Sequence, residues 1–308
     1  MERRETLGLI GIGNIGSVFA EAFLRAGHEV VGFNRPDARA FEAMGGKPAA
    51  SARAVAEAAE IVFCCLPDEA AAESIYPGAD GLVAGLGPGH LVLDLASYTL
   101  PFKRRLAEEV ARTGARLLDG EVSGTPDMLR NRAGSIFLAG DAEACARCLP
   151  LCRAVTAEAF VLGPFGAATK MKLINNLLSA VHTAAAAEAM ALGVKAGFEP
   201  DLLARVLSSG SGSSKFLVSR APLMAARRFD QPSGRLKLFG KYLEHIPELA
   251  ADAGCATPLF DAAKRCFEEA LAQGRGDEDI AVVFEVIEAM PRTGDARAAV
   301  GGQPTRSA

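Results

Sequence analysis

The sequence of 308 residues contains no tryptophan, and aromatic residues make up only 6% of it, so it has few candidates for stacking on nucleic-acid bases. Its 33 lysines and arginines do not exceed its 37 aspartates and glutamates, which leaves a net charge of −4. This balance argues against binding to nucleic acid or to an anionic membrane surface, because both need a basic face. The sequence has no run of about 18 apolar residues, the length of a membrane span. Glycines interrupt the apolar run that begins at Leu7, so we expect no secretory signal peptide.

Seven cysteines in a chain of this length do not form a disulfide framework, and their number is odd. Cys64 and Cys65 lie in an apolar run and are typical of small core residues in a reducing compartment, so we expect a cytoplasmic protein. Cys145, Cys148 and Cys152 are spaced to share one helix face. A metal site normally needs four ligands, so this pattern predicts a packed face and no metal site.

From Thr6 to about Leu162, short apolar runs alternate with helical stretches, as in a parallel sheet with helices on both faces. After Phe165 the strand-like runs stop, and long alanine- and leucine-rich segments follow. The sequence therefore predicts an α/β protein with a doubly wound Rossmann domain in residues 1–165 and an all-α helical domain in residues 166–292. The expected strands are Leu7–Ile10, Val30–Phe33, Ile61–Leu66, Leu91–Leu95 and Arg116–Leu118.

Two features of the second half extend this prediction. Its first helix is expected from about Ala167 to Ala196, which is long enough to join two domains or to form a dimer seam. Residues 293–308 are small and polar, and we expect them to form a disordered tail.

A glycine motif follows the first expected strand and opens the first expected helix. In the motif, Gly11 makes a tight turn, Gly13 lets the backbone approach a pyrophosphate, and Gly16 lets the helix pack closely on the strand. The helix N-terminus adds free N–H groups and the positive end of the helix dipole. A GxGxxG pattern alone is weak evidence, but the strand and helix around it favour dinucleotide binding over a simple turn. The motif is Gly11-Ile12-Gly13-Asn14-Ile15-Gly16.

The end of the second expected strand indicates which dinucleotide is used. NAD-selective sites usually carry an aspartate or glutamate there, whereas this sequence has Asn34 and Arg35. The planar guanidinium of Arg35 is suited to a 2′-phosphate; the alternative is a solvated arginine at a helix start. We therefore expect NADP as the cofactor, in preference to NAD.

The long helix carries a polar stripe. At about 100° per residue, Lys172, Asn176, Ser179 and Thr183 fall within roughly 40° of one another in azimuth, whereas Lys170 points about 200° away from Lys172. Burial disfavours the charged form of lysine, so Lys172 in this apolar setting is suited to exchange a proton with a substrate near neutral pH. The alternative is that Lys172 is an ordinary surface lysine and Asn176 a helix filler.

A third motif, Val122-Ser123-Gly124-Thr125, follows the last expected strand and precedes Pro126 and an expected helix. The Ser123 hydroxyl and the backbone amides beside it are suited to a carboxylate. By itself, however, the segment would be interpreted as an ordinary turn.

Together these segments resemble the β-hydroxyacid dehydrogenases, which include 3-hydroxyisobutyrate dehydrogenase, the glyoxylate and succinic semialdehyde reductases and 6-phosphogluconate dehydrogenase. Gly11–Arg35 is similar to the family's opening, and Val122–Gly124 to its Ser-Gly-Gly motif. Lys172 and Asn176 are similar to its catalytic lysine and to the asparagine four residues later. The resemblance spans about Thr6 to Ile287, and the ordered combination is far more specific than any one motif.

The resemblance implies a two-domain enzyme with its active site in the cleft between the domains, assembled as a homodimer or homotetramer. It implies that Lys172 is the general acid or base and that Asn176 orients it or the substrate. A small carboxylate-bearing substrate would be held by Ser123, Gly124, Thr125 and Lys241, the last in a segment similar to a further family motif. The cofactor is expected to contact the glycine motif, Asn34, Arg35, Leu66, Pro67 and Ser97.

Two departures from the family pattern leave the substrate open. Thr125 stands where the family has its second motif glycine, and Tyr242 stands where it usually has aspartate. The retained Lys172 argues against the imine reductases, and the arrangement from Lys170 to Asn176 is most similar to the NADPH-preferring glyoxylate and succinic semialdehyde reductases.

We therefore predict an NADP-dependent β-hydroxyacid dehydrogenase that reduces a short aldehyde- or keto-acid. The alternatives are an imine reductase, or a non-catalytic NADP-binding sensor or scaffold, since a fold alone does not define a function. A scaffold would not need a lysine and an asparagine on one face of an apolar helix.

Overall fold

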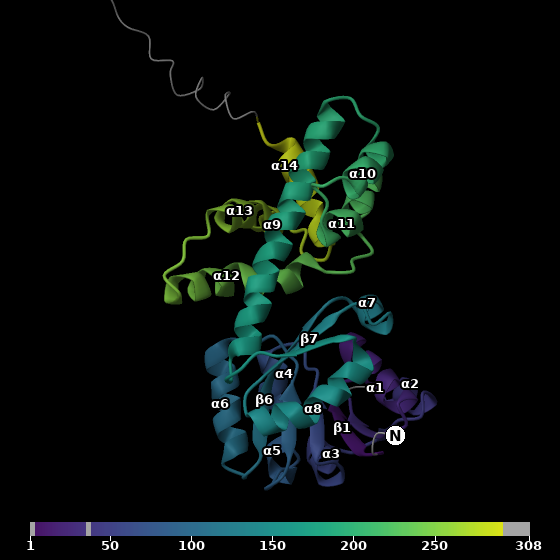
Figure 1. Cartoon of the computed structure of the whole chain (residues 1–308), viewed down its shortest axis with the longest axis vertical. Coiled ribbons are helices and arrows are strands. Elements are labelled where there is room, and N and C mark those ends of the chain that lie inside the picture. Colours follow the sequence, from purple (N-terminus) through teal and green to yellow (C-terminus); the bar gives the residue numbers. More distant parts are fainter. Residues whose placement is uncertain (1–3, 35–37, 292–308) are drawn as a thin grey trace, which may run out of the picture. The chain divides into compact units, whose positions relative to one another are not determined.

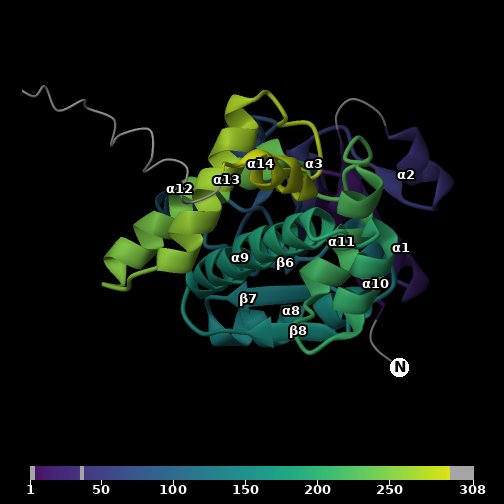
Figure 2. The same cartoon turned by 90° about the horizontal axis from the view of Figure 1, so that it is seen from above.

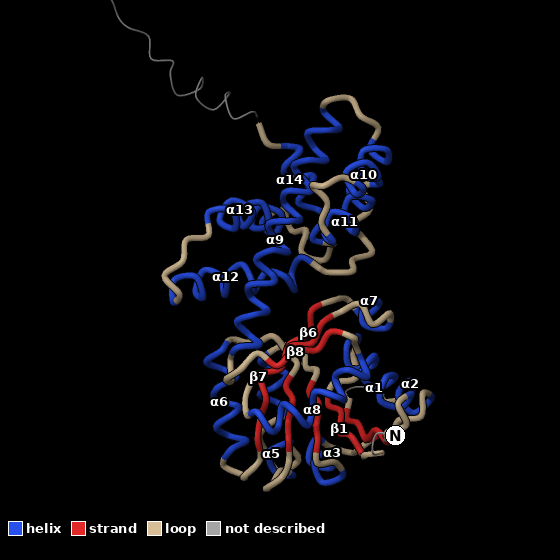
Figure 3. The backbone as a smooth tube through the Cα atoms, viewed as in Figure 1, coloured by secondary structure: helices blue, strands red, loops and turns tan. Residues whose placement is uncertain are grey.

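The computed structural model describes residues 4–34 and 38–291, and its contacts divide the chain into two compact units, Met1–Asn175 and Asn176–Ala308. Within the described residues, named strands occur only in the first unit, and the second consists of helices and loops (Figure 3). This confirms the expected α/β class, a Rossmann-type sheet followed by a helical region. The expected tail, residues 293–308, lies outside the described residues.

In the described part of the first unit, the sheet has eight strands in the order β3-β2-β1-β4-β5-β6-β7-β8. All neighbouring pairs are parallel except β6 and β7, which are antiparallel. β7 and β8 lie side by side at one edge (Figure 2). The strands are β1 (Thr6–Ile10), β2 (Glu29–Phe33), β3 (Lys47–Pro48), β4 (Ile61–Cys64), β5 (Leu91–Asp94), β6 (Arg116–Ser123), β7 (Ser135–Ala139) and β8 (Glu158–Val161).

Three of these strands, β3, β7 and β8, are not among those expected from the sequence. β3 is only the exposed dipeptide Lys47-Pro48, which has no apolar pattern, and β7 and β8 are five and four residues long. Pairing with neighbouring strands specifies all three. The expected run Arg116–Leu118 also continues further, because β6 extends along β7 as far as Ser123.

Helices cover both faces of the sheet, as expected for a doubly wound fold (Figure 1). One buried cluster joins the sheet to α1 (Asn14–Arg25) and α8 (Ala142–Val155), and includes Phe23 packed 4.8 Å from the Phe63 ring. The other cluster joins it to α3 (Ala52–Ala58), α4 (Glu69–Ile75), α5 (Leu82–Gly85) and α6 (Leu100–Ala111). The short helices α2 (Arg39–Ala43) and α7 (Pro126–Arg130) complete the unit.

The three cysteines expected to share a face, Cys145, Cys148 and Cys152, are all buried in the first cluster. They line the side of α8 that packs on α1 and the sheet, and so serve as small apolar residues. Within residues 4–34 and 38–291, no group of three or more His, Cys, Asp or Glu side chains is arranged to hold a metal ion.

The carboxyl ends of the parallel strands meet in one row. Ile10 is in register with Phe33 and Cys64, Cys64 with Asp94, and Asp94 with Asp119. The chain order reverses between β1 and β4, and open α/β sheets bind ligands at such a switch point, beyond the carboxyl ends of the strands. The glycine motif and the segments after β4 and β5 all begin at this edge.

A single long helix, α9 (Ala167–Lys195), passes from the first unit into the second. The boundary between the two compact units therefore falls inside α9, between Asn175 and Asn176. The physical reason is that the first turns of α9 hydrogen-bond to β6, through Thr169 and Lys172. An 18-residue window of α9 has a mean hydropathy of 1.4, enough by length and composition alone to cross a membrane, and 44% of it is buried. Core helices of soluble proteins pass the same test, so the match assigns no membrane role to α9.

The second unit contains five further α-helices in the described part of the chain. α12 and α13 run side by side (Figures 1 and 2). Arg220 of α11 forms a buried ion pair with Asp279, 3.1 Å apart, just before the 3-10 helix η1. The elements are α10 (Pro200–Ser209), α11 (Lys215–Ala226), α12 (Leu236–Asp252), α13 (Pro258–Ala272), η1 (Ile280–Val282) and α14 (Val283–Ala289).

Candidate active site

The glycine motif forms a tight loop between β1 and α1. Gly11 has a φ of +84°, a conformation that side chains disfavour, and a Cβ on Gly16 would lie 2.0 Å from the Gly11 carbonyl oxygen. A Cβ on Gly13, by contrast, would meet nothing within 4 Å in the structure, so the backbone there is open to a ligand. Among the described residues, no side chain caps the N-terminus of α1, so its amides point outward. This is the geometry that a pyrophosphate requires.

Asn34 closes the loop from the end of β2. Its Oδ1 accepts a hydrogen bond from the Ile12 amide at 3.1 Å, and the Gly11 amide donates to the Phe33 carbonyl at 3.0 Å. An uncharged amide thus occupies the place after β2 where NAD-selective proteins carry an acid. Arg35, the other residue expected to select the cofactor, lies outside the described residues.

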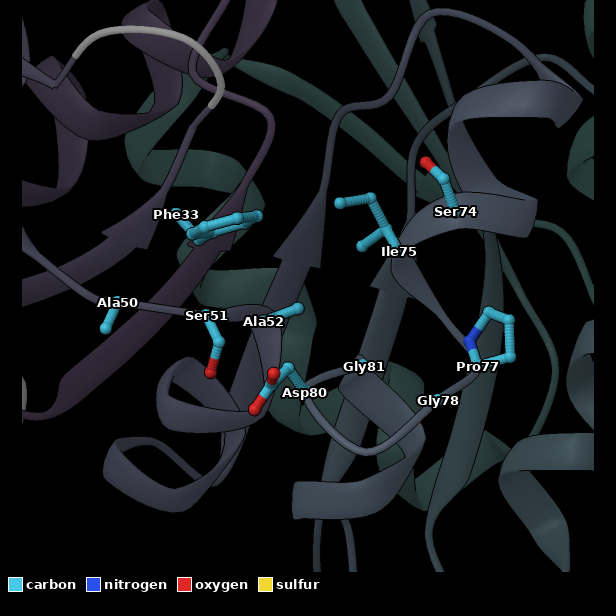
Figure 4. Close-up of a pocket in the computed structure, with 10 residues that line it drawn as sticks. All are labelled: Phe33, Ala50, Ser51, Ala52, Ser74, Ile75, Pro77, Gly78, Asp80 and Gly81. Carbon is cyan, nitrogen blue, oxygen red and sulfur yellow. The ribbon is translucent and has the colours of Figure 1, made fainter.

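A pocket of about 540 Å³ opens beside this strand end (Figure 4). Phe33, the last residue of β2, and Ile75 of α4 form apolar walls, and Ser51 and Asp80 add polar atoms. Leu66 and Pro67, also expected to contact the cofactor, follow β4, where Leu66 is half-buried and Pro67 is exposed. The pocket and the glycine loop belong to the same sheet edge.

A glycine and a helix cap together define the backbone conformation of the Val-Ser-Gly-Thr segment. Ser123 ends β6, and Gly124 has a φ of +141°, which only glycine adopts readily. Thr125 has a φ of −83°, open to any residue, and its Oγ1 accepts a hydrogen bond from the Met128 amide at 3.3 Å as the N-cap of α7. The departure from the family's glycine at Thr125 therefore costs no backbone strain and supplies a helix cap.

Lys172 lies at the Val-Ser-Gly-Thr segment. Its Nζ donates a hydrogen bond to the Val122 carbonyl oxygen at 2.8 Å, and the side chain is half-buried. Lys170 is exposed on another side of α9, as the helical spacing indicates. The structure thus brings Lys172 together with Val122 and the residues that follow it, which are some 50 positions away in the chain.

The structure adds Asn175, which is not among the residues expected from the sequence. Its Nδ2 donates to the Ser123 hydroxyl at 3.2 Å, so it orients a residue expected to hold the substrate. A signal was present, because Asn175 follows Lys172 by three residues and is only about 60° away in azimuth. Asn176, the selected residue, is buried, as are Ser179 and Thr183 on the same stripe. Thr183 bonds back to the Ser179 carbonyl at 2.7 Å, so this part of the stripe is engaged within the helix.

Lys241 lies in the second unit, on α12. Its Nζ is 5.4 Å from the centroid of the Tyr242 ring, and Tyr242 in turn packs 5.5 Å from Phe239. A lysine over an aromatic face makes a cation–π contact, so Tyr242 gives Lys241 a partner that differs from the family's aspartate. The contribution of Lys241 to a substrate site stays a prediction.

A buried charged network, which the sequence analysis missed, lies behind the strand ends. The Lys103 ammonium donates to Asp119 at 2.8 Å and to Glu121 at 3.2 Å, and all three side chains are at most 1% exposed. Ser97, expected to contact the cofactor, donates to the other Glu121 oxygen at 2.5 Å. Lys103 shares the buried face of α6 with Leu106 and Val110. Its position on that apolar face is the one sequence feature that indicates a buried lysine.

Burial and neighbouring charges oppose each other in this network. Burial raises the pKa of Glu121, while the positive charges of Lys103 and Lys172 act to lower it. Burial lowers the pKa of Lys103, but the negative charges of Glu121, Asp119 and Asp94 outweigh it and the pKa is raised. The network therefore keeps Lys103 protonated.

Comparison with known proteins assigns this arrangement to a class. Residues 6–163 match a family model described as the NAD binding domain of 6-phosphogluconate dehydrogenase. Residues 166–287 match one described as NAD-binding of NADP-dependent 3-hydroxyisobutyrate dehydrogenase. These two models, together with curated relatives that are dehydrogenases, show that the chain is an NAD(P)-dependent oxidoreductase that acts on CH–OH groups. The chain belongs to the β-hydroxyacid dehydrogenase family.

Individual relatives agree with this assignment. L-threonate dehydrogenase of Cupriavidus necator is 32% identical over 293 residues, which cover 94% of this chain and 98% of that protein. 3-Hydroxyisobutyrate dehydrogenase of Pseudomonas aeruginosa is 36% identical over 210 residues, covering 68% and 70%. A crystal structure of 3-hydroxyisobutyrate dehydrogenase from Salmonella typhimurium has a TM-score of 0.82 at 26% identity, covering 92% of this chain and 99% of that one. An imine reductase from Pseudomonas sp. shares the fold more distantly, at a TM-score of 0.62, with 20% identity over 92% of this chain and all of that one.

Proposed function

We propose that this protein is an NADP-dependent reductase of a short aldehyde- or keto-acid, with Lys172 as its general acid. The observation that supports the proposal is the hydrogen bond from the Lys172 ammonium to the carbonyl oxygen of Val122, the residue that precedes Ser123 and Gly124 in the chain. A carbonyl acid offers the two groups that this arrangement suits. Its carboxylate can accept hydrogen bonds from a hydroxyl and from exposed backbone, and its carbonyl oxygen needs a proton.

The residues at the sheet edge fit a bound dinucleotide. The Gly13 backbone is open, the α1 amides face outward, and the pocket beside Phe33 offers room for the adenosine half. Bound NADPH would supply the hydride that reduces the carbonyl carbon. We place its 2′-phosphate near Asn34, because no carboxylate at that position would repel it.

The chain's own residues then have separate tasks. Ser123, oriented by Asn175, and the Gly124 backbone hold the substrate carboxylate. Lys172, held at the Val122 carbonyl, gives its proton to the carbonyl oxygen in reduction and takes it from the hydroxyl in the reverse direction. We retain Asn176 as the residue that orients Lys172 or the substrate, and Lys241 as a second carboxylate contact. Holding reactants in place in this way supplies much of the rate.

The test is NADPH oxidation with a panel of short carbonyl acids that includes glyoxylate and succinic semialdehyde, with a cyclic imine alongside. The proposal expects turnover with at least one acid. Turnover of the cyclic imine alone would instead indicate an imine reductase. Binding of NADPH with no turnover of any compound would indicate a non-catalytic NADP sensor.

Asn34 provides a test of cofactor choice. We expect Asn34→Asp to weaken NADPH use by about tenfold, or about 1.4 kcal/mol, because a carboxylate would face the 2′-phosphate. The substituted side chain keeps the oxygen that accepts the Ile12 amide, so the loop should stay intact. Comparing kcat/KM for NADPH and NADH in both proteins checks this. An unchanged ratio would contradict the proposed place of the phosphate.

We also propose that the protein is a cytoplasmic homodimer or homotetramer. Large apolar side chains stand exposed on the second unit, including Leu192, Phe198, Leu202, Val206 and Val218. All seven cysteines, each within the described residues, are free, which fits a reducing compartment. Light scattering coupled to gel filtration is expected to give two or four times the mass of the chain, and a monomer mass would refute the assembly.

A further inference from the structure

Glu121 is a buried carboxylate with a different partner on each oxygen. Its Oε1 accepts a hydrogen bond from Lys103 at 3.2 Å, and its Oε2 accepts one from Ser97 at 2.5 Å. The side chain is 1% exposed. A carboxylate taken fully out of water is costly unless it is paired, so a glutamate at this place needs a physical reason.

Structural pairing explains only part of the network. Lys103 is already balanced by Asp119, at 2.8 Å, and also donates to the Gly120 carbonyl at 2.9 Å. Asp119 accepts two further hydrogen bonds, from the Thr169 amide and hydroxyl of α9. Lys103 and Asp119 would therefore form a satisfied pair without a second carboxylate.

A second positive charge acts on Glu121, that of Lys172. Glu121 directly precedes Val122, whose carbonyl oxygen holds the Lys172 ammonium, and the Lys172 charge acts on the Glu121 carboxyl. Five charged groups meet at this end of β6. They are Asp94 of β5, Lys103 of α6, Asp119 and Glu121 of β6, and Lys172 of α9. Asp94 is itself engaged by the Tyr76 hydroxyl, whose oxygen is 2.5 Å from Oδ2. Of the three carboxylates, Glu121 is the closest in sequence to Val122, whose carbonyl oxygen binds Lys172.

We infer that Glu121 is a positioning residue for the reaction, whose negative charge stabilises the Lys172 ammonium at Val122 and whose second oxygen fixes the Ser97 hydroxyl. The inference rests on the proposed role of Lys172 as the proton donor. Glu121 itself neither gives nor takes a proton. In reduction the proton passes from Lys172 Nζ to the substrate oxygen and leaves a neutral amine, and Glu121 keeps the donor charged until that step.

Direct titration of Lys172 tests this without any substrate. Lysine reactivity toward an amine-modifying reagent would be followed against pH by peptide mass spectrometry, with exposed Lys170 as the internal reference. In Glu121→Gln, we expect the Lys172 titration to move to lower pH by about one unit, because a nearby opposite charge is lost. Glu121→Asp withdraws the charge by one methylene, so a smaller shift in the same direction is expected. Lys170 should not move in either variant.

The control is Glu108→Gln, which removes one exposed carboxylate from α6 and should leave Lys172 unchanged. Circular dichroism establishes that each variant is folded, and Glu121→Asp carries the test if Glu121→Gln does not fold. An unchanged Lys172 titration in folded Glu121 variants would overturn the inference. With an active substrate, the alkaline limb of the reduction profile should shift by the same amount. No turnover in the wild-type protein would refute the proposed function, while the titration would still decide whether Glu121 stabilises the Lys172 ammonium.

Discussion

Replacing Lys172 by methionine is expected to lower kcat for carbonyl-acid reduction by at least about 10²-fold, the usual contribution of a general acid. Methionine keeps the length of the aliphatic stem but has no proton to give. Because Lys172 contacts β6 rather than the glycine loop, the affinity for NADPH should stay within about threefold, or about 0.7 kcal/mol. Steady-state kinetics and a fluorescence titration with NADPH measure the two quantities.

Lys170→Met is the matched control for that experiment. It removes the same charge two residues earlier on α9, from an exposed side chain, and should leave kcat unchanged. Equal losses in the two variants would point to a general effect of charge on α9. An undiminished kcat in Lys172→Met would show that Lys172 is not the general acid and would refute the proposed mechanism.

Replacing Lys103 by methionine is expected to lower the free energy of unfolding by about 3–5 kcal/mol, because it leaves Asp119 and Glu121 buried without their cation. Burial already raises the pKa of Glu121, and loss of the Lys103 charge would raise it further, so the folded protein would bind more protons than the unfolded one. The stability of the variant should therefore rise as the pH falls from neutral toward about 5. Urea unfolding at several pH values measures this.

A second substitution separates charge from packing in this network. Adding Glu121→Gln to Lys103→Met removes one of the two uncompensated charges, so the double variant should be more stable than Lys103→Met alone. If Lys103→Met lowers the free energy of unfolding by less than about 1 kcal/mol, which is the contribution of an exposed ion pair, the result would contradict a buried network. Equal stability of the single and double variants would show that Glu121 is not part of it.

The residues of the site differ in how well the sequence alone predicts them. The glycine loop was predictable because it needs only a strand, a helix and three glycines within six positions. Lys172 and Ser123 were singled out because a polar residue on an apolar helix and a Ser-Gly pair after a strand are local patterns. Asn175 was missed because its partner, Ser123, is 52 positions away. Helical spacing alone does not distinguish it from Asn176.

The contacts of the charged network are even less predictable from the sequence. Lys103, Asp119 and Glu121 are ordinary polar residues in sequence, and their spacings of 16 and 18 positions indicate no contact. They meet because β5 and β6 pair in parallel and α6 connects them across one face of the sheet. Neither the burial of Lys103 nor the two partners of Glu121 follow from composition or periodicity.

The class of fold and the dinucleotide loop are predictable from residue order alone, because apolar periodicity and glycine geometry act over a few neighbouring residues. The family resemblance likewise depended on motifs, each short and contiguous. The neighbours of Lys172 follow only from the folded chain, because they depend on strands that pair in space. The hydrogen bonds of Lys172 to Val122, of Asn175 to Ser123 and of Ser97 to Glu121 each join segments at least 24 positions apart. Contacts between residues so far apart in the sequence form only when the chain packs, so no local sequence pattern predicts them.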